Sequence, residues 1–229
     1  MLRVGLTGDL GSGKSTVARM LAERGAIVLS SDEMGRAMMQ PGEAVFAAIV
    51  EQFGSGVVAA AGTLDRRRLA ELAFDPQAPR VEELNAIVHP AVLAAQAEAV
   101  AKFAGTDKVV VVESALIFSA YGTTPEELRS RFDRVVLVVA PEAQKIARYV
   151  ERVAAGRELS AEERVALEAD ARRRLALQHT EVHAAECLVV QNDADVAELA
   201  DRVSAVWDEL VGTPLSPPYF RAKVFNRLR

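Results

Sequence analysis

The residues with the clearest chemical pattern lie near the start of the chain, at Gly8–Ser15. They read G-D-L-G-S-G-K-S and match the phosphate-loop pattern G-x-x-x-x-G-K-[S/T]. An apolar run precedes the loop and a helical pattern follows it, which is the context that such loops require. Glycines let backbone N–H groups converge on phosphate oxygens, and the start of the helix adds positive potential. The segment predicts a site for nucleotide phosphates.

Two side chains of this loop have separate predicted roles. Lys14 supplies a cation to the β- and γ-phosphates, and the Ser15 hydroxyl is a ligand of Mg²⁺. The residues expected to bind the nucleotide are Gly11, Ser12, Gly13, Lys14, Ser15 and Thr16.

A carboxylate follows the second apolar run, at Asp32 in the sequence VLSSD. Ligands of open parallel sheets bind beyond the carboxyl ends of the strands, so this side chain is expected to face the transferring phosphate. A phosphotransferase needs a group that orients the acceptor hydroxyl and takes its proton. The alternative is a helix cap, since Ser30, Ser31 and Asp32 all cap well.

Other charged side chains offer weaker signals. Glu113 ends a run of four valines, where an acid can assist Mg²⁺ or simply be solvated. The arginines Arg148, Arg152 and Arg172–Arg174 could contact phosphates, although most charges on exposed helices are only solvated. His179 and His183 have the spacing of zinc ligands, but Thr180 stands where the metalloprotease pattern has glutamate, so a zinc site is disfavoured.

Five short valine-rich runs are expected to be the strands that position these residues. They are 3–7, 26–30, 108–113, 133–140 and 187–191. The runs lack strict alternation and are separated by helical patterns, which is typical of buried parallel strands. The sequence therefore predicts an α/β fold with a five-stranded parallel sheet.

The unequal intervals between these runs predict the domain organisation. Residues 1–32, 106–143 and 184–211 would form the nucleotide-binding core. About eighty residues separate the second and third runs, too many for one crossover, so 33–105 is expected to be a helical insertion. The charged segment 144–183 is either a solvated helical pair or a mobile lid, and 212–229 would be a loosely docked basic tail.

Composition narrows the class of protein. The formal net charge is −5 over 229 residues, which disfavours a nucleic-acid-binding surface. The single cysteine, Cys187, excludes an intramolecular disulfide. We expect no apolar run near the roughly 20 residues that span a membrane, no signal peptide and a cytoplasmic location.

Several segments in one order resemble the dephospho-coenzyme A kinase family, over about residues 3–193. They are GLTGDLGSGKSTVA (5–18), SSDEMGR (30–36), GTLDRRRLAELAF (62–74), LNAIVHP (84–90), RLALQ (174–178) and AECLVVQND (185–193). The chain departs from the family pattern at Ser30, where an acid is usual, and at Glu113, where D-x-P is common.

The resemblance implies a reaction in which the γ-phosphate of ATP passes to the ribose 3′-hydroxyl of dephospho-coenzyme A, with Mg²⁺. Asp32 would act as the base and Arg148 would meet phosphate, while Arg36 and His89 would bind the acceptor. The helical insertion and lid would enclose it.

Two other functions stay open at this point. One is a kinase for another small acceptor, such as a nucleoside monophosphate. The other is a nucleotide-dependent switch protein that transfers no phosphate.

Overall fold

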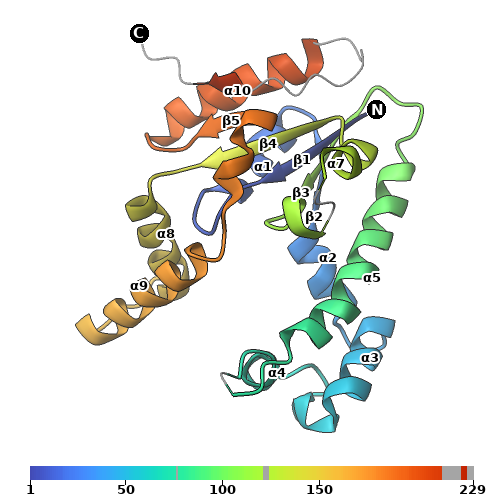
Figure 1. Cartoon of the computed structure of the whole chain (residues 1–229), viewed down its shortest axis with the longest axis vertical. Helices are drawn as coiled ribbons and strands as arrows, with labels where there is room; N and C mark the ends of the chain where they lie inside the picture. Colours follow the sequence, from blue (N-terminus) through green and yellow to red (C-terminus); the bar gives the residue numbers. More distant parts are fainter. Residues whose placement is uncertain (76, 121–123, 213–222, 226–229) are drawn as a thin grey trace. The chain divides into compact units, whose positions relative to one another are not determined.

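The computed structural model describes residues 1–75, 77–120, 124–212 and 223–225. Its sheet has the strand order β2-β3-β1-β4-β5-β6 (Figure 1). The strands are β1 Leu2–Thr7, β2 Ile27–Ser30, β3 Val109–Glu113, β4 Arg134–Val139, β5 Leu188–Gln191 and β6 Lys223–Phe225. The pairs β1–β3, β1–β4, β4–β5 and β5–β6 run parallel. The α/β class and the five expected strands are confirmed, each within about one residue of the expected bounds.

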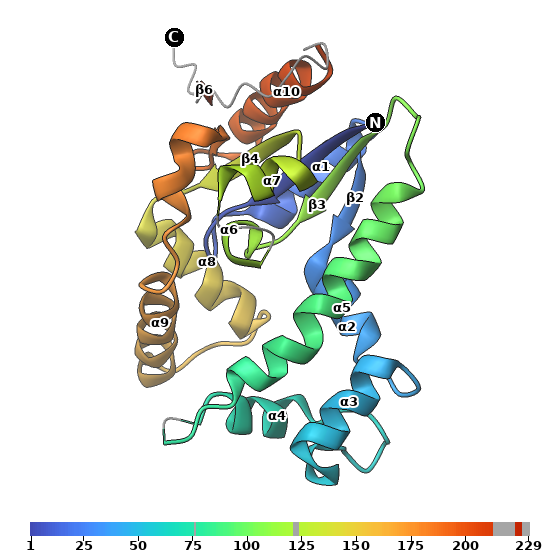
Figure 2. The ribbon, with the colours of Figure 1, turned by 45° about the vertical axis from the view of Figure 1, so that its right-hand side comes forward.

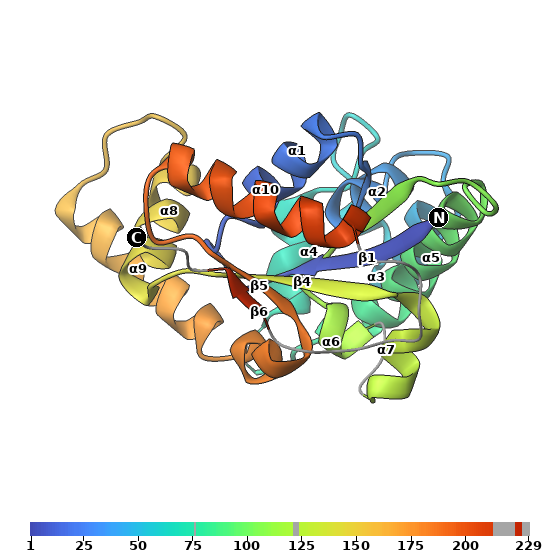
Figure 3. The same ribbon diagram turned by 90° about the horizontal axis from the view of Figure 1, so that it is seen from above.

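Helices cover both faces of this sheet. The helices of the described residues are α1 Lys14–Glu23, α2 Ser31–Met38, α3 Ala44–Phe53, α4 Arg66–Ala73, α5 Val81–Ala101, α6 Ile117–Ala120, α7 Pro125–Arg131, α8 Glu142–Ala154, α9 Ala161–Leu175 and α10 Val196–Gly212, with 3₁₀ turns η1 Ser55–Val57 and η2 Thr180–Glu186. Figure 3 shows α1 and α10 on one face of the strands, with α6 and α7 on the other. Covered faces explain why the valine runs do not alternate with polar residues.

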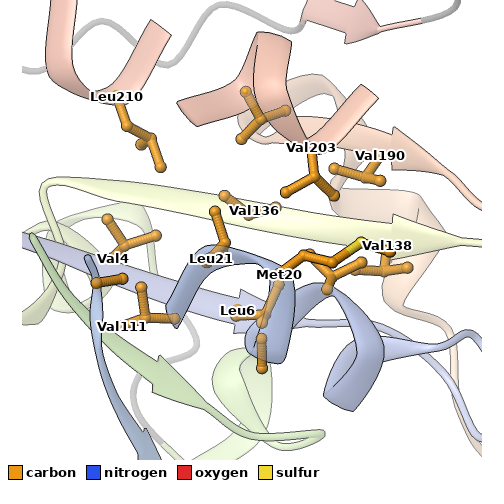
Figure 4. Close-up of a cluster of buried hydrophobic side chains, with 14 of the residues drawn as sticks. Val4, Leu6, Met20, Leu21, Val111, Val136, Val138, Val190, Val203 and Leu210 are labelled. Carbon is orange, nitrogen blue, oxygen red and sulfur yellow. The ribbon is translucent and has the colours of Figure 1, made fainter. Parts of the chain in front are cut away.

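The main core lies between the sheet and the α1–α10 layer (Figure 4). Alternate residues of the central strands point into it, because successive strand side chains leave opposite faces. Those at the centre are Val4 and Leu6 of β1, Val111 of β3, Val136 and Val138 of β4 and Val190 of β5, against Leu21 of α1 and Val203 of α10. This packing fixes the carboxyl ends of the strands, where the phosphate loop begins.

The chain divides into two compact units, Met1–Val28 with Phe103–Arg229, and Leu29–Lys102. The second unit is helical, as expected for 33–105: α2, α3 and α4 each pack against α5 (Figure 2). Its apolar cluster is built on Val45, Ile49, Phe53, Val57 and Leu69. The segment 144–183 contains most of α8 and all of α9, and it belongs to the first unit; its role as a lid stays a prediction.

Two expectations need correction. Most of the predicted tail, at 213–222 and 226–229, lies outside the described residues, but Lys223–Phe225 form β6 beside β5, a sixth strand that the sequence analysis missed.

The expectation of no apolar segment of membrane-spanning length is also wrong for α5. That helix has 21 residues and contains an 18-residue stretch with a mean hydropathy of 1.2, so by length and composition alone it is a weak candidate for a membrane span.

Candidate active site

The phosphate loop joins β1 to α1 and requires glycine at its last turn. Gly13 is the N-cap of α1 with φ 97°, in the left-handed region that favours glycine. A Cβ added there would lie only 2.1 Å from the amide nitrogen Nδ2 of Asn192. The backbone conformation and this close approach together explain why glycine stands before Lys14.

Gly13→Ala is therefore expected to lower kcat/KM by about 10²-fold or more, because small displacements at a reacting site have effects of this size. Gly25→Ala is the matched control. Gly25 has a similar φ of 102°, but nothing lies within 4 Å of the added Cβ. Each variant should lose about 1–2 kcal/mol of stability to backbone strain, measured by denaturant unfolding. Equal activity losses in both variants would contradict the role of the Asn192 contact.

Lys14 and Ser15 lie where the loop pattern predicts. The ammonium Nζ of Lys14 donates to the carbonyl oxygens of Gly8 (2.7 Å) and Asp9 (3.0 Å). The Ser15 hydroxyl donates to Oε1 of Glu113 at 2.9 Å. The structure thus brings together the loop hydroxyl and the acid at the end of β3.

This pair fits the chemistry of Mg²⁺, which prefers a hydroxyl or carboxylate oxygen and keeps ligands from phosphates and water. Within the described part of the chain, no group of three or more His, Cys, Asp or Glu side chains is placed to hold a metal ion. A metal bound at Ser15 and Glu113 would therefore draw most of its ligands from the nucleotide and solvent.

Arg148 and Asn192 hold the second half of the loop. Arg148 Nη1 donates to the carbonyls of Gly11 (3.4 Å) and Ser12 (3.5 Å), and its Nη2 donates to Asn192 O at 3.1 Å. The buried amide of Asn192 donates to Ser12 O at 2.7 Å. Occupied carbonyls leave N–H groups of the loop to face an anion. Arg148, expected at a phosphate, here contacts the loop backbone.

Gln178 holds the first half of the loop. Its Oε1 accepts the backbone N–H of Leu10 at 2.7 Å. Gln178 ends the RLALQ segment, three residues beyond the end of α9, so the chain that follows the helical pair is hydrogen-bonded to the phosphate loop.

Asp32 lies in the second unit, in the first turn of α2, and is exposed. The cap of that helix is Ser30, whose Oγ accepts the N–H of Glu33 at 3.5 Å. The capping alternative is therefore wrong for Asp32, since a neighbouring residue has that role. The exposed Asp32 carboxylate is therefore not used to cap α2.

Arg36 lies on the wall of a cavity of about 470 Å³ within the second unit. The wall also includes Arg66 and the apolar residues Met39, Leu64, Leu69, Phe74 and Leu84. Phe74 is 67% exposed, which is unusual for so large an apolar side chain. His89 does not line this cavity; it is half-buried on α5, directly before Pro90.

The other arginines singled out in the sequence, Arg152 and Arg172–Arg174, have partners within α8 and α9. Arg172 pairs with Glu168 (3.2 Å), Arg173 with Asp170, and Arg174 with Asp170 (2.8 Å). Arg152 and Arg174 lie over the ring of Tyr149. None of these contacts involves the phosphate loop.

His183 and Cys187 are accounted for by packing. The His183 ring stacks on Phe118, with centroids 3.9 Å apart. Burial raises the pKa of the Cys187 thiol to about 12, so it is not a thiolate nucleophile at neutral pH. The zinc interpretation of the histidine pair gains no support from the described residues.

Sequence reasoning proposed Glu113 only as one of two alternatives. It gave no role to Gln178 and Asn192, although both lie in segments that carry the family resemblance, and it missed Lys145. Asn192 follows β5 directly, so the strand-end rule that singled out Asp32 would also have found it. Lys145 carried no such signal, because it lies on a charged helical segment, and Gln178 was marked only by the resemblance of RLALQ to the family.

Comparison with known proteins agrees with this geometry. A family model described as dephospho-CoA kinase matches residues 2–198. The dephospho-CoA kinase of Streptomyces avermitilis is 38% identical over 212 residues, covering 92% of this chain and 95% of that protein. That of Thermobifida fusca is 37% identical over 211 residues, covering 92% and 96%.

Solved structures agree on the fold. TT1252 from Thermus thermophilus superposes with a TM-score of 0.64 at 28% identity, covering 91% of this chain and 97% of that one. A dephospho-CoA kinase from Campylobacter jejuni gives 0.56 at 18% identity, covering 92% and 98%. By its family match and its relatives, this chain belongs to the dephospho-CoA kinase family.

Proposed function

We propose that this chain transfers the γ-phosphate of ATP to the ribose 3′-hydroxyl of dephospho-coenzyme A. The observation that carries the proposal is the phosphate loop of a chain in this family, with Lys14 spanning the loop and Ser15 bonded to Glu113. Other P-loop kinases share such a loop, so the acceptor is assigned by family membership.

The chain's own residues divide the chemistry among them. The loop backbone from Gly11 to Thr16 binds the phosphates, and Lys14 stabilises charge that develops on the transferring group. Bound at Ser15 and Glu113, Mg²⁺ would neutralise phosphate charge. Arg148 keeps the loop carbonyls engaged, and its own contact with phosphate stays a prediction. Asp32 orients the acceptor hydroxyl and takes its proton.

The cavity at Arg36 supports binding of a long, amphipathic acceptor. Dephospho-coenzyme A carries a pyrophosphate, which suits arginine, and a pantetheine arm, which suits an apolar wall. The cavity offers both kinds of lining, with Arg36 and Arg66 beside Leu64, Leu69 and Phe74. The role of His89 stays a prediction.

The test compares acceptors at saturating magnesium-ATP and identifies each product by mass. Remote binding energy can orient a reacting group, so truncated acceptors are expected to lose kcat as well as affinity. Dephospho-coenzyme A should be phosphorylated efficiently, while adenosine and AMP should be poor acceptors, although each carries a ribose 3′-hydroxyl. Equal kcat/KM for AMP would replace the assignment with a nucleotide kinase, and no transfer to any acceptor would favour the switch protein.

A further inference from the structure

The phosphate loop contains a carboxylate, Asp9, in a segment whose task is to bind an anion. The side chain is buried, with the residue only 5% exposed. Buried charges interact more strongly than exposed ones, because water screens them less. An unneutralised carboxylate at this position would therefore oppose the binding of nucleotide phosphates.

Both oxygens of this carboxylate have partners from the segment 144–183. Nζ of Lys145, on α8, donates to Oδ2 at 2.9 Å, and the Thr180 hydroxyl, in η2, donates to Oδ1 at 2.6 Å. The Lys145 and Asp9 side chains are 9% and 7% exposed, so this is a buried ion pair. Removal of one partner from such a pair leaves an uncompensated charge in the interior.

Lys145 carries its charge at neutral pH. Burial lowers the pKa of the ammonium, but hydrogen bonds and charge attraction from Asp9 and then Glu181 exceed that effect and raise it overall. Glu181 lies 3.2 Å away and its side chain is 56% exposed, so solvent screens it. The positive charge of the Lys145 ammonium is therefore neutralised mainly by Asp9.

The neighbouring loop residue is bound to the same helical pair. Leu10 packs against the apolar cluster formed by Ile146, Tyr149, Val150, Ala171 and Leu175. Its N–H is the one bonded to Gln178. A cavity of about 390 Å³ borders this contact and is lined by both Asp9 and Lys145. The ion pair lies at the point where α8 and η2 meet the first half of the loop.

We propose that Lys145 is a positioning residue for nucleotide binding, which neutralises Asp9 and holds the first half of the loop in its anion-binding form. Lys145 acts through Asp9 and needs no contact with ATP. The inference rests on the proposed binding of ATP by this loop, and it is independent of the acceptor's identity.

The test is a double-mutant cycle read by calorimetric binding of magnesium-ATP and of ADP to the full chain. Lys145→Met should weaken both nucleotides by about tenfold or more, because it leaves the Asp9 charge unpaired beneath the phosphates. Because Asp9→Asn removes the carboxylate that Lys145 neutralises, Asp9→Asn with Lys145→Met should bind both nucleotides about as tightly as Asp9→Asn alone and more tightly than Lys145→Met. Lys108→Met is the control: it removes the same charge from an exposed residue just before β3, and it should bind normally.

Steady-state kinetics distinguishes a positioning role of Lys145 in nucleotide binding from a general loss of structure in the variant. In Lys145→Met, KM for ATP should rise while kcat at saturating ATP and KM for dephospho-coenzyme A stay within about threefold. If Lys145→Met does not fold, the comparison of the double variant with Asp9→Asn still applies, since neither has an unpaired carboxylate. Failure of wild type to bind ATP would overturn the loop assignment itself. Normal ATP binding by Lys145→Met, or a double variant as weak as Lys145→Met, would overturn only the role of Lys145.

Discussion

Replacement of Lys14 by alanine is expected to lower kcat/KM by about 10³-fold or more, because it removes the cation from the position where charge develops on the transferring phosphoryl group. The fold should survive. The Lys14 ammonium makes hydrogen bonds to the Gly8 and Asp9 carbonyls, each worth about 1 kcal/mol net, against a total stability of about 5–15 kcal/mol.

The measurement is steady-state transfer to dephospho-coenzyme A, with unfolding by denaturant as the check on the fold. Arg19→Ala is the matched control, since it removes a cation from the exposed face of the same helix, where Arg19 pairs with Glu23. That control should keep nearly full activity, because exposed ion pairs contribute about 0–1 kcal/mol. A folded Lys14→Ala protein with wild-type turnover would rule out this loop as the transfer site.

The sequence predicted the parts of the fold that depend on short-range patterns. The strands β3 and β4 carry unbroken apolar runs, mostly of valine, that are buried on both faces, which single-sequence reasoning recognises well. β6 is only three residues long and follows a proline-rich segment. A strand so short carries no periodicity, and its pairing depends on the free edge of β5.

In the candidate site, too, the residues set by short-range patterns could be predicted and those set by long-range packing could not. Lys14 and Ser15 follow from local spacing, and Glu113 from its position at a strand end. The pairing of Asp9 with Lys145 spans 136 positions and depends on how α8 packs beside the loop. On a helix rich in charged residues, a lysine looks solvated until the packing is known. Long-range ion pairs of this kind were therefore outside what the sequence could predict.

Replacement of Asp32 by asparagine should lower kcat by about 10²–10⁴-fold with little change in ATP affinity, the range typical of general-base assistance. Ser30 caps α2 through the N–H of Glu33, so the cap survives the change. Loss of one carboxylate from the first turn removes about 0.3–1 kcal/mol of interaction with the helix dipole.

The variant Glu33→Gln separates the loss of general-base assistance from the loss of interaction with the helix dipole. Glu33 is the next exposed acid in the first turn of α2, so its neutralisation changes the net charge and the dipole interaction in the same way. Asparagine at position 32 can still accept a hydrogen bond but cannot take the acceptor's proton at neutral pH. The two variants should therefore unfold at similar denaturant concentrations, while only Asp32→Asn loses turnover at saturating ATP and dephospho-coenzyme A. If both variants turn over alike, the acid at position 32 is not the base, and the proton of the 3′-hydroxyl leaves by another route.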